Sequence, residues 1–366
     1  MTLVKDITHY LEQIAPLSYQ ESYDNAGLIV GNPQNEVTGV LVTLDSTEAV
    51  VDEAIAKGCN LIVAHHPIVF KGLKKLNGKN YVERTVIKAI KNDIAVYAIH
   101  TNLDHVMGGV NSMIAERLHL QNVRILSPKS DTLLKLVSFV PTEATQKVLD
   151  ALYEAGVGAI GNYDHCSFRV NGTGTFRPNE AAQPHIGSAY KDEEVTEDRI
   201  EVIFPAYMEG KVLSTLKQAH PYEEVAYYCS TLRNQHQEVG AGTVGELPEP
   251  MTNDDFLTYL KEKMDLNVIR HTAFIGDSIR KVAVCGGAGG FLLNNAVQAK
   301  ADVFVTADYK YHEFFDADGR ILICDIGHYE SEVYTKELLQ RYLSKKFVNF
   351  ATILSETNTN PVFYRS

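Results

Sequence analysis

The sequence of 366 residues predicts an α/β protein: two related βαβ halves form one core, and a ferredoxin-like α+β domain is inserted between them. Apolar runs alternate with amphipathic segments in the first third of the chain, and the last third repeats this order. The middle of the chain has a different order of strands and helices. Continuous apolar strands separated by amphipathic helices are typical of parallel sheets covered on both faces. We therefore expect the halves of the core at 1–126 and 246–366, and the insert at 127–245.

The first third alternates apolar strands with amphipathic helices. Ser46 or Thr47 is a suitable N-cap for the first helix, and Gly58 is a suitable residue to end it. The expected elements are a strand at 37–45, a helix at 46–58, a strand at 60–66, a helix at 82–93 and a strand at 94–100.

The last third has the same plan. CNLIVAHH (59–66) and ADVFVTAD (301–308) occupy equivalent positions, and so do IAVYAIHTNLD (94–104) and ILICDIGHYES (321–331), which indicates two related halves. The expected elements are a strand and glycine turn at 280–290, a helix at 291–301, strands at 301–308 and 320–328, and a helix at 332–346.

The middle reads strand-helix-strand twice, which is the order of a split βαβ, ferredoxin-like fold. A polar loop between the two parts is expected to be exposed. The expected elements are a strand at 133–141, a helix at 143–156, extended hairpin residues at 164–176, a strand at 199–205, a helix at 210–220 and a strand at 223–232.

Composition and charge argue against several classes of protein. The formal net charge of −12 disfavours a nucleic-acid partner, because such proteins neutralise phosphates with basic residues. The apolar runs all fall short of the ~18 residues that a membrane span needs, and the acidic, amphipathic start lacks the apolar core of a signal peptide. The five cysteines are scattered and never in C-x-x-C spacing, which is typical of free thiols in a reducing compartment. We expect a cytoplasmic protein without a membrane partner.

Three clusters of candidate metal ligands follow predicted strands. The first is a histidine pair at the end of the apolar run LIVA, and the second lies in HTNLDH (100–105). The third lies in GHYESE (327–332), where a histidine and a glutamate spaced i, i+4 would share one face of a helix. Ligands gather at the carboxyl ends of strands in open α/β sheets, so we expect the clusters to meet. The candidate ligands are His65, His66, Asp104, His328 and Glu332.

This set of side chains indicates a two-metal centre. Imidazoles with carboxylates suit a borderline divalent ion such as zinc, manganese or iron. Five ligands exceed the three that a catalytic zinc takes from the protein, whereas two ions ~3.5–4 Å apart can share them through a bridging carboxylate. Successive residues of a strand point apart, so His65 and His66 could each hold a different ion.

Each of these features also has a simpler interpretation. A histidine pair can end a strand, a lone aspartate can cap a turn, and H-x-x-x-E on a helix can be a solvated pair. Their position at one edge of a sheet favours the metal interpretation. His100 and His105 are either partners that orient Asp104 or surface groups, and we favour the surface interpretation for His105.

Other stretches leave alternatives open. CGGAGG (285–290) follows a strand, so its amides could cradle a phosphate, but it lacks a complete nucleotide-binding fingerprint and we favour a tight turn. Asp308, within TADYKYHE, could line a pocket or stand at an ordinary helix start. GTGTFRP (172–178) and HPYEEVAY (220–227) are too specific for routine turns, although their spacing assigns them no chemistry.

The motifs ESYDNAGLIVG (21–31), VAHHPIVF, HTNLD, VCGGAGG, TADYKYHE and GHYESE together resemble those of the GTP cyclohydrolase I type 2 homologue family, also called Ngg-one-interacting-factor-three-like proteins. The resemblance covers the whole chain. GTGTFRP and HPYEEVAY are similar to the PII/CutA-like insert of the longer family members.

The resemblance implies a two-half α/β core, a toroidal homohexamer enclosing a cavity, and two divalent metal ions per subunit, with zinc expected first and iron or manganese as alternatives. The ligands that it implies are the same as those chosen from spacing: His65, His66, Asp104, His328 and Glu332.

The leading functional hypothesis is a metal-dependent hydrolase that acts on a purine nucleotide, as in ring-opening hydrolysis of GTP at C8. The ions would supply hydroxide at neutral pH, and Asp308 or Glu330 are candidates for carrying protons. The alternative is a metal-dependent regulatory or scaffolding homo-oligomer without catalytic turnover. The sequence assigns no catalytic residue and no organic cofactor.

Overall fold

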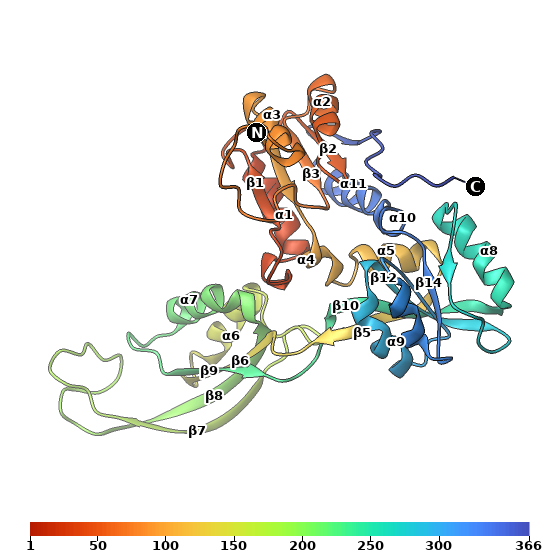
Figure 1. Cartoon of the computed structure of the whole chain (residues 1–366). Coiled ribbons are helices and arrows are strands. Elements are labelled where there is room, and N and C mark those ends of the chain that lie inside the picture. Colours follow the sequence, from red (N-terminus) through yellow and green to blue (C-terminus); the bar gives the residue numbers. More distant parts are fainter. Residues whose placement is uncertain (366) are drawn as a thin grey trace. The chain divides into compact units, whose positions relative to one another are not determined.

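The computed structural model describes residues 1–365, and its strands form three sheets with helices packed on them (Figure 1). The chain divides into two units. Unit 1 combines Met1–Pro128 with the part of the chain from Glu238 onward, and unit 2 is Lys129–Gln237. The predicted mixed α/β class is confirmed. A structural relationship between two halves of the core stays a prediction.

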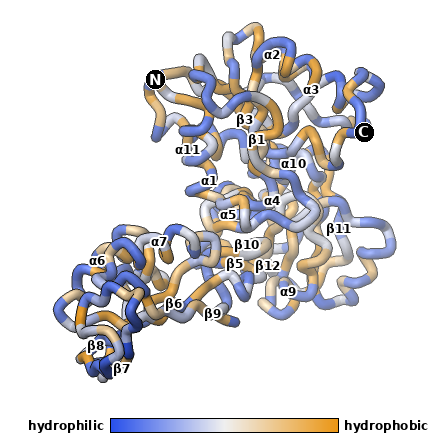
Figure 2. The backbone as a smooth tube through the Cα atoms, turned by 90° about the vertical axis from the view of Figure 1, so that its left-hand side faces the viewer, coloured by the Kyte–Doolittle hydropathy of each residue, from blue (hydrophilic) through white to orange (hydrophobic). Residues whose placement is uncertain are grey.

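The first sheet of unit 1 has five strands in the order β1-β4-β3-β2-β15. The strands β15, β2, β3 and β4 run parallel, and β1 pairs antiparallel with β4. All four residues of β3 are apolar and buried. In Figure 2, which colours the backbone by hydropathy, apolar residues such as these are orange. The strands are β1 (Gly27–Val30), β2 (Gly39–Thr43), β3 (Leu61–Ala64), β4 (Ala95–Ala98) and β15 (Ala351–Leu354).

Helices cover both faces of this sheet. Apolar residues of α1 and α11 pack against one face, and those of α2 and α3 pack against the other. Thr47 is the N-cap of α2 and accepts a hydrogen bond from the amide of Val50, so the predicted cap is confirmed. These helices are α1 (Val4–Ile14), α2 (Glu48–Ala56), α3 (Tyr81–Lys91) and α11 (Thr335–Lys346); a short 3₁₀ turn, η1 (Leu17–Tyr19), follows α1.

The second sheet of unit 1 has six strands in the order β11-β14-β13-β12-β10-β5. Its centre is parallel, because β12, β13 and β14 run in the same direction, whereas β10 is antiparallel to β12 and β11 is antiparallel to β14. The strands are β5 (Gln121–Lys129), β10 (His236–Met251), β11 (Arg270–His271), β12 (Ile279–Ala288), β13 (Val303–Ala307) and β14 (Leu322–Asp325).

The second sheet is also covered on both faces. The helices α5 and α8 pack on one face, and the segment that contains η3 and α9 packs on the other. Two short helices, α4 and α10, follow β4 and β14, and they carry candidate ligands. These elements are α4 (Thr101–Asp104), α5 (Val110–Arg117), α8 (Asn253–Met264), η3 (Gly290–Leu292), α9 (Leu293–Gln298), η4 (Tyr311–Ala317) and α10 (His328–Glu332).

Unit 2 has one antiparallel sheet of four strands in the order β7-β8-β6-β9. Apolar residues of α6 and α7 pack against the same face of this sheet. The chain order β-α-β-β-α-β is the split βαβ order expected from the sequence. Its elements are β6 (Leu133–Pro141), α6 (Thr145–Glu154), β7 (Phe168–Phe176), β8 (Glu193–Pro205), η2 (Ala206–Met208), α7 (Glu209–Ala219) and β9 (Tyr227–Leu232).

Candidate metal centre

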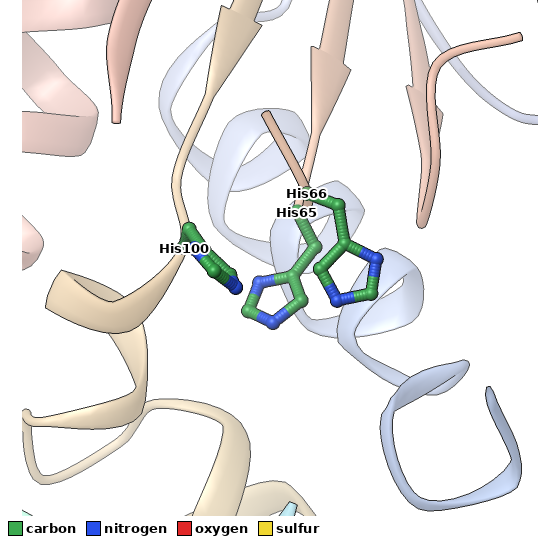
Figure 3. A group of neighbouring side chains, drawn as sticks. All are labelled: His65, His66 and His100. Atoms are coloured by element: carbon green, nitrogen blue, oxygen red, sulfur yellow. The ribbon is translucent and has the colours of Figure 1, made fainter. Parts of the chain in front are cut away.

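Three imidazoles lie together at the ends of β3 and β4 (Figure 3). The amides of His65 and His66 still bond to the carbonyls of Thr43 and Leu44, at 3.2 and 2.9 Å, so both residues are held beyond the last residue of β3. His100 stands between β4 and α4. Its ring centroid lies 5.3 Å from those of His65 and His66.

These three histidines, and His328 at the start of α10, are each anchored through Nδ1. All four acceptors are carbonyl or carboxylate oxygens, which cannot donate, so Nδ1 carries a proton in each ring, and loss of any proton on Nε2 gives a neutral ring with its lone pair on Nε2. This is the tautomer that a metal ligand needs. The contacts are His65 with Ile99 O at 2.8 Å, His66 with Asp45 Oδ1 at 2.7 Å, His100 with Asp24 Oδ1 at 2.7 Å, and His328 with Asp308 Oδ2 at 2.8 Å.

The two carboxylate oxygens of Glu332 face different partners. Oε2 lies 2.9 Å from Nε2 of His66 and 3.0 Å from Nε2 of His328. Oε1 lies 3.9 Å from Nε2 of His65, which is itself 3.6 Å from Oδ1 of Asp104. Glu332 therefore belongs to two groups of side chains that could hold a metal ion, one with His66 and His328 and the other with His65 and Asp104.

Two buried atoms in the group of His65, Asp104 and Glu332 show whether a cation would fit there. Nε2 of His65 and Oδ1 of Asp104 are both buried and accept or donate no hydrogen bond within residues 1–365. Leaving such atoms without partners costs about 1–3 kcal/mol each. One cation between them would satisfy a lone pair and a negative charge together, so the residues present fit a metal ion.

Burial and mutual repulsion shape the ionisation of this cluster. Burial lowers the pKa of His65 to about 3, so its ring is neutral at physiological pH. Burial and the nearby charge of Glu332 hold the pKa of Asp104 well above its usual range. Burial would also raise the pKa of Glu332, but hydrogen bonds from His328 and His66 outweigh it and hold that pKa well below normal. Two close carboxylates with a neutral histidine favour a bound positive charge.

The glycine-rich end of β12, where the pairing register with β13 shifts between Val284 and Ala288, lets Glu332 approach. Gly287 has φ +62°, and a Cβ on it would lie 2.4 Å from Oε1 of Glu332. Its amide donates to Oγ of Ser331 at 2.9 Å, and the amide of Gly286 donates to Oδ1 of Asn111 at 2.9 Å. These amides are committed to the protein's own side chains, which argues against a phosphate cradle at this end of β12.

A cavity of about 1050 Å³ opens onto the cluster within unit 1. Of the five predicted ligands, His66, Asp104, His328 and Glu332 line it, while His65 is fully buried behind them. Aromatic side chains, among them Phe70 and Phe291, contribute to its walls. The cavity is large enough to hold a drug-sized or nucleotide-sized molecule next to the cluster.

Comparison with known proteins identifies the family. The sequence matches the description Duf34/NIF3 (NGG1p interacting factor 3) over residues 2–361. The chain belongs to the Duf34/NIF3 family. A GTP cyclohydrolase 1 type 2 homolog of Bacillus subtilis (strain 168) is 40% identical over 364 residues, which are 98% of this chain and 97% of that protein. A similarly named protein of Halalkalibacterium halodurans is 39% identical over 361 residues, covering 97% of each chain.

Solved structures of Duf34/NIF3 relatives have the same fold. A Bacillus cereus protein related to NIF3 matches with a TM-score of 0.87 and 40% identity, covering 100% of this chain and 99% of that one. A Staphylococcus aureus protein matches with a TM-score of 0.79 and 33% identity, with the same coverage.

The structure adds two residues to the Duf34/NIF3 site that spacing did not select. His100 forms a candidate group with His65 and His66. Asp24, from the motif ESYDNAGLIVG, accepts from His100 and from the amide of Thr101; burial opposes these contacts, but they lower the pKa of Asp24 to about 2. Seventy-six positions separate Asp24 from His100, so only the family motif carried a signal for it.

The surface interpretation of His105 is wrong. Its side chain is 4% exposed, and Nδ1 lies 3.0 Å from the carbonyl of Tyr19. His105 ends the short helix α4 and contacts η1 through Tyr19, and it also lines the cavity next to the cluster.

Among residues 1–365 of this Duf34/NIF3 chain, no helix has the length and apolarity that crossing a membrane requires.

Proposed function

We propose that this Duf34/NIF3 chain binds two divalent metal ions through His65, His66, Asp104, His328 and Glu332, and that it is a metal-dependent hydrolase acting on a purine nucleotide. The observation that carries the proposal is the position of Glu332, whose two carboxylate oxygens face separate groups of ligands. A carboxylate in this position can bridge two ions. Zinc suits the donor set first, with iron or manganese as alternatives.

The protein's own residues would prepare the site for this chemistry. Asp45 and Asp308 fix two imidazoles in the ligating tautomer, and such partners commonly change metal affinity by a factor of about 10–100. Divalent ions held there would polarise a substrate and supply hydroxide at neutral pH. The aromatic walls of the cavity can contact a base, and Arg270 lies at the same cavity, paired with Asp325, where it can meet a phosphate.

The name of the curated relatives supports GTP as the first substrate to test. Protein reconstituted separately with zinc, manganese and iron is incubated with GTP, and formate release is measured, because opening the guanine ring at C8 releases that carbon. We expect release with at least one metal and none from Glu332→Gln. A protein that retains its metal but releases no formate with any of the three ions is not a GTP ring-opening enzyme.

A regulatory homo-oligomer without turnover is the second candidate, and the separate unit 2, with a cavity of its own, favours it. In this version unit 2 acts as a PII/CutA-like effector domain, and the chain assembles as a toroidal homohexamer. The double variant His65→Ala, Asp104→Ala separates the candidates, with light scattering to measure whether it still assembles as a hexamer. A variant that loses metal while the hexamer and partner binding stay intact favours an enzyme or a sensor over a scaffold. Loss of the hexamer or of partner binding together with the metal supports a metal-dependent scaffold.

A further inference from the structure

A second cavity, of about 660 Å³, lies within unit 2 on one face of its sheet. Ile200, Val202 and Phe204 of β8 pack against α6 and α7. Side chains alternate along a strand, so Glu197 and Arg199 project from the opposite face, and both line the cavity. Residues of the segment 177–186 close it from the far side. The cavity is therefore a pocket between the sheet and this loop, separate from the candidate metal centre.

Two glycines of the motif GTGTFRP form the floor of the pocket. A Cβ on Gly172 would meet no atom within 4 Å, so the space above this residue is open. A Cβ on Gly174 would lie 2.1 Å from Oε2 of Glu197, so only glycine lets that carboxylate lie across the strand. Glycine weakens a strand, and its presence inside one often marks a place where a ligand approaches the backbone.

A buried carboxylate stands at one end of this floor. Glu197 is only 8% exposed although it projects from the sheet face that carries no helix of unit 2. Its Oε1 accepts a hydrogen bond from the hydroxyl of Tyr222 at 2.9 Å. Its Oε2 accepts none from residues 1–365. A buried carboxylate with an oxygen free to accept can bind a group that presents N–H donors.

The motif HPYEEVAY positions Tyr222. Nε2 of the buried His220 lies 3.0 Å from the carbonyl of Phe139, and its Nδ1 accepts from the amide of Tyr222 at 3.1 Å. Burial lowers the pKa of His220, which keeps this ring neutral with one donor and one acceptor. Both motifs that the metal centre leaves unexplained therefore build the same pocket.

Aromatic side chains wall the pocket at both ends. The ring centroids of Phe176 and Tyr222 are 6.1 Å apart, and those of Phe139 and Tyr228 are 5.8 Å apart. Such walls suit a flat ring that stacks or makes edge contacts. The volume of this pocket lies in the range of small-molecule binding sites.

The charges around the pocket disfavour a phosphate. Arg177 is paired with Asp192 at 2.6 Å, and Arg199 is paired with Glu201 at 2.7 Å. Glu223 and Glu224 line the pocket together with Glu197. The acidic groups therefore outnumber the unpaired basic ones, and an uncharged ligand is favoured over a nucleotide.

We propose that the pocket of unit 2 between Glu197, Tyr222 and the glycines of GTGTFRP binds an uncharged planar nitrogen heterocycle with two adjacent N–H donors, of the kind that guanine presents at N1 and its 2-amino group. The donors meet the carboxylate of Glu197, and the ring lies over Gly172 between the aromatic walls. The inference is independent of the hydrolase proposed above.

Guanosine is the probe, titrated into the full-length protein by calorimetry. We expect saturable binding that Glu197→Gln weakens by about tenfold or more, because the amide turns an acceptor into a donor. Gly172→Val fills the open space without clashing with the backbone, and it should abolish binding. Glu194→Gln removes an exposed carboxylate from the same strand and is the matched control; it should bind as the wild type does.

Two further comparisons complete the experiment. Inosine, which lacks the amino group, should bind more weakly than guanosine, and adenosine, which lacks the N1–H donor, should bind most weakly. Glu332→Gln tests whether guanosine also binds at the metal centre; the binding that Glu197→Gln weakens should persist in Glu332→Gln, because it belongs to unit 2. The inference is overturned if millimolar guanosine gives no saturable binding, if adenosine binds as tightly, or if Glu197→Gln binds as the wild type does with an unchanged melting temperature.

Discussion

Nε2 of His66 lies 2.9 Å from Oε2 of Glu332, although 266 positions separate the two residues in the chain. His66 follows a strand of the first sheet, and Glu332 ends α10 beyond a strand of the second. The contact therefore joins side chains from both sheets of unit 1, which explains why the cluster can have two groups of ligands. Burial lowers the pKa of His66, but the carboxylates of Asp45 and Glu332 outweigh burial and raise this pKa to about 10. The ring of His66 therefore favours its positively charged, protonated form.

The two groups of ligands predict different losses of metal. Asp104→Asn removes a carboxylate that belongs only to the group with His65, whereas Glu332→Gln removes one that belongs to both. We expect Asp104→Asn to lower the metal content from about two ions to about one per chain, and Glu332→Gln to lower it close to zero. Elemental analysis after desalting measures this ratio.

Glu330→Gln is the control for metal content, because Glu330 lies on the same helix and bonds to Asn360 rather than to the cluster. Equal losses in Asp104→Asn and Glu332→Gln would show that the ions bind as one cooperative unit, and not in two separable groups.

The clustering of the candidate ligands could be predicted from the sequence, because each follows a strand or lies at i, i+4 on a helix, and both signals are local. The orienting contacts were not, since Asp24 meets His100 only through the fold. The assignment of α11 and β15 to the first sheet was equally hidden. Val40 of β2 pairs with Thr352 of β15, and apolar periodicity says that such a segment is buried without saying against which sheet.

Replacement of Gly287 should disturb the metal centre from outside it. In Gly287→Ala the new Cβ would lie 2.4 Å from Oε1 of Glu332, and the backbone has φ +62°. We expect a loss of metal affinity together with roughly 1 kcal/mol of backbone strain. Gly319→Ala is a matched control, because Gly319 has φ +64° but open space around its Cβ. Chelator competition gives the affinity and thermal unfolding gives the stability; equal affinities in the two variants would refute the steric argument.

Acid should weaken the attachment of the C-terminal segment through Glu53. This carboxylate accepts from Ser355, from Thr357 and from the amide of Glu356. Burial opposes these contacts and the pairing with Lys57, but together they lower the pKa of Glu53 from 4.5 to about 2. Because the folded pKa is the lower one, the stabilisation is complete above pH 4.5 and is lost as the pH falls towards 2.

The contribution of Glu53 at neutral pH is on the order of 2 kcal/mol, after allowance for its partial exposure. Urea unfolding of the wild type and Glu53→Gln, both with chelator present to remove metal effects, measures it. The difference in the free energy of unfolding should be largest at pH 7 and shrink as the pH approaches 2. A difference that stays constant over that range would mean that Glu53 acts through shape and not through charge.

Asp45 should control metal affinity without being a ligand. It accepts from Nδ1 of His66 at 2.7 Å and from the hydroxyl of Thr359 at 2.5 Å, so it holds both the imidazole ring and the C-terminal segment. Asp45→Asn keeps the size of the side chain but removes the charge that fixes the ring tautomer. We expect affinity for zinc to fall about 10–100-fold, as is usual for groups that orient a metal-bound histidine. Competition with a chromophoric chelator measures this change.

The control for Asp45 is Asp52→Asn. Asp52 is paired with Lys88 on the exposed side of α2, and its loss should leave zinc affinity unchanged. The Thr359→Val variant separates the two roles of Asp45, because it releases the C-terminal segment and leaves the contact with His66 in place. If Thr359→Val lowers zinc affinity as much as Asp45→Asn does, the C-terminal segment and not the histidine tautomer determines how tightly the metal is held.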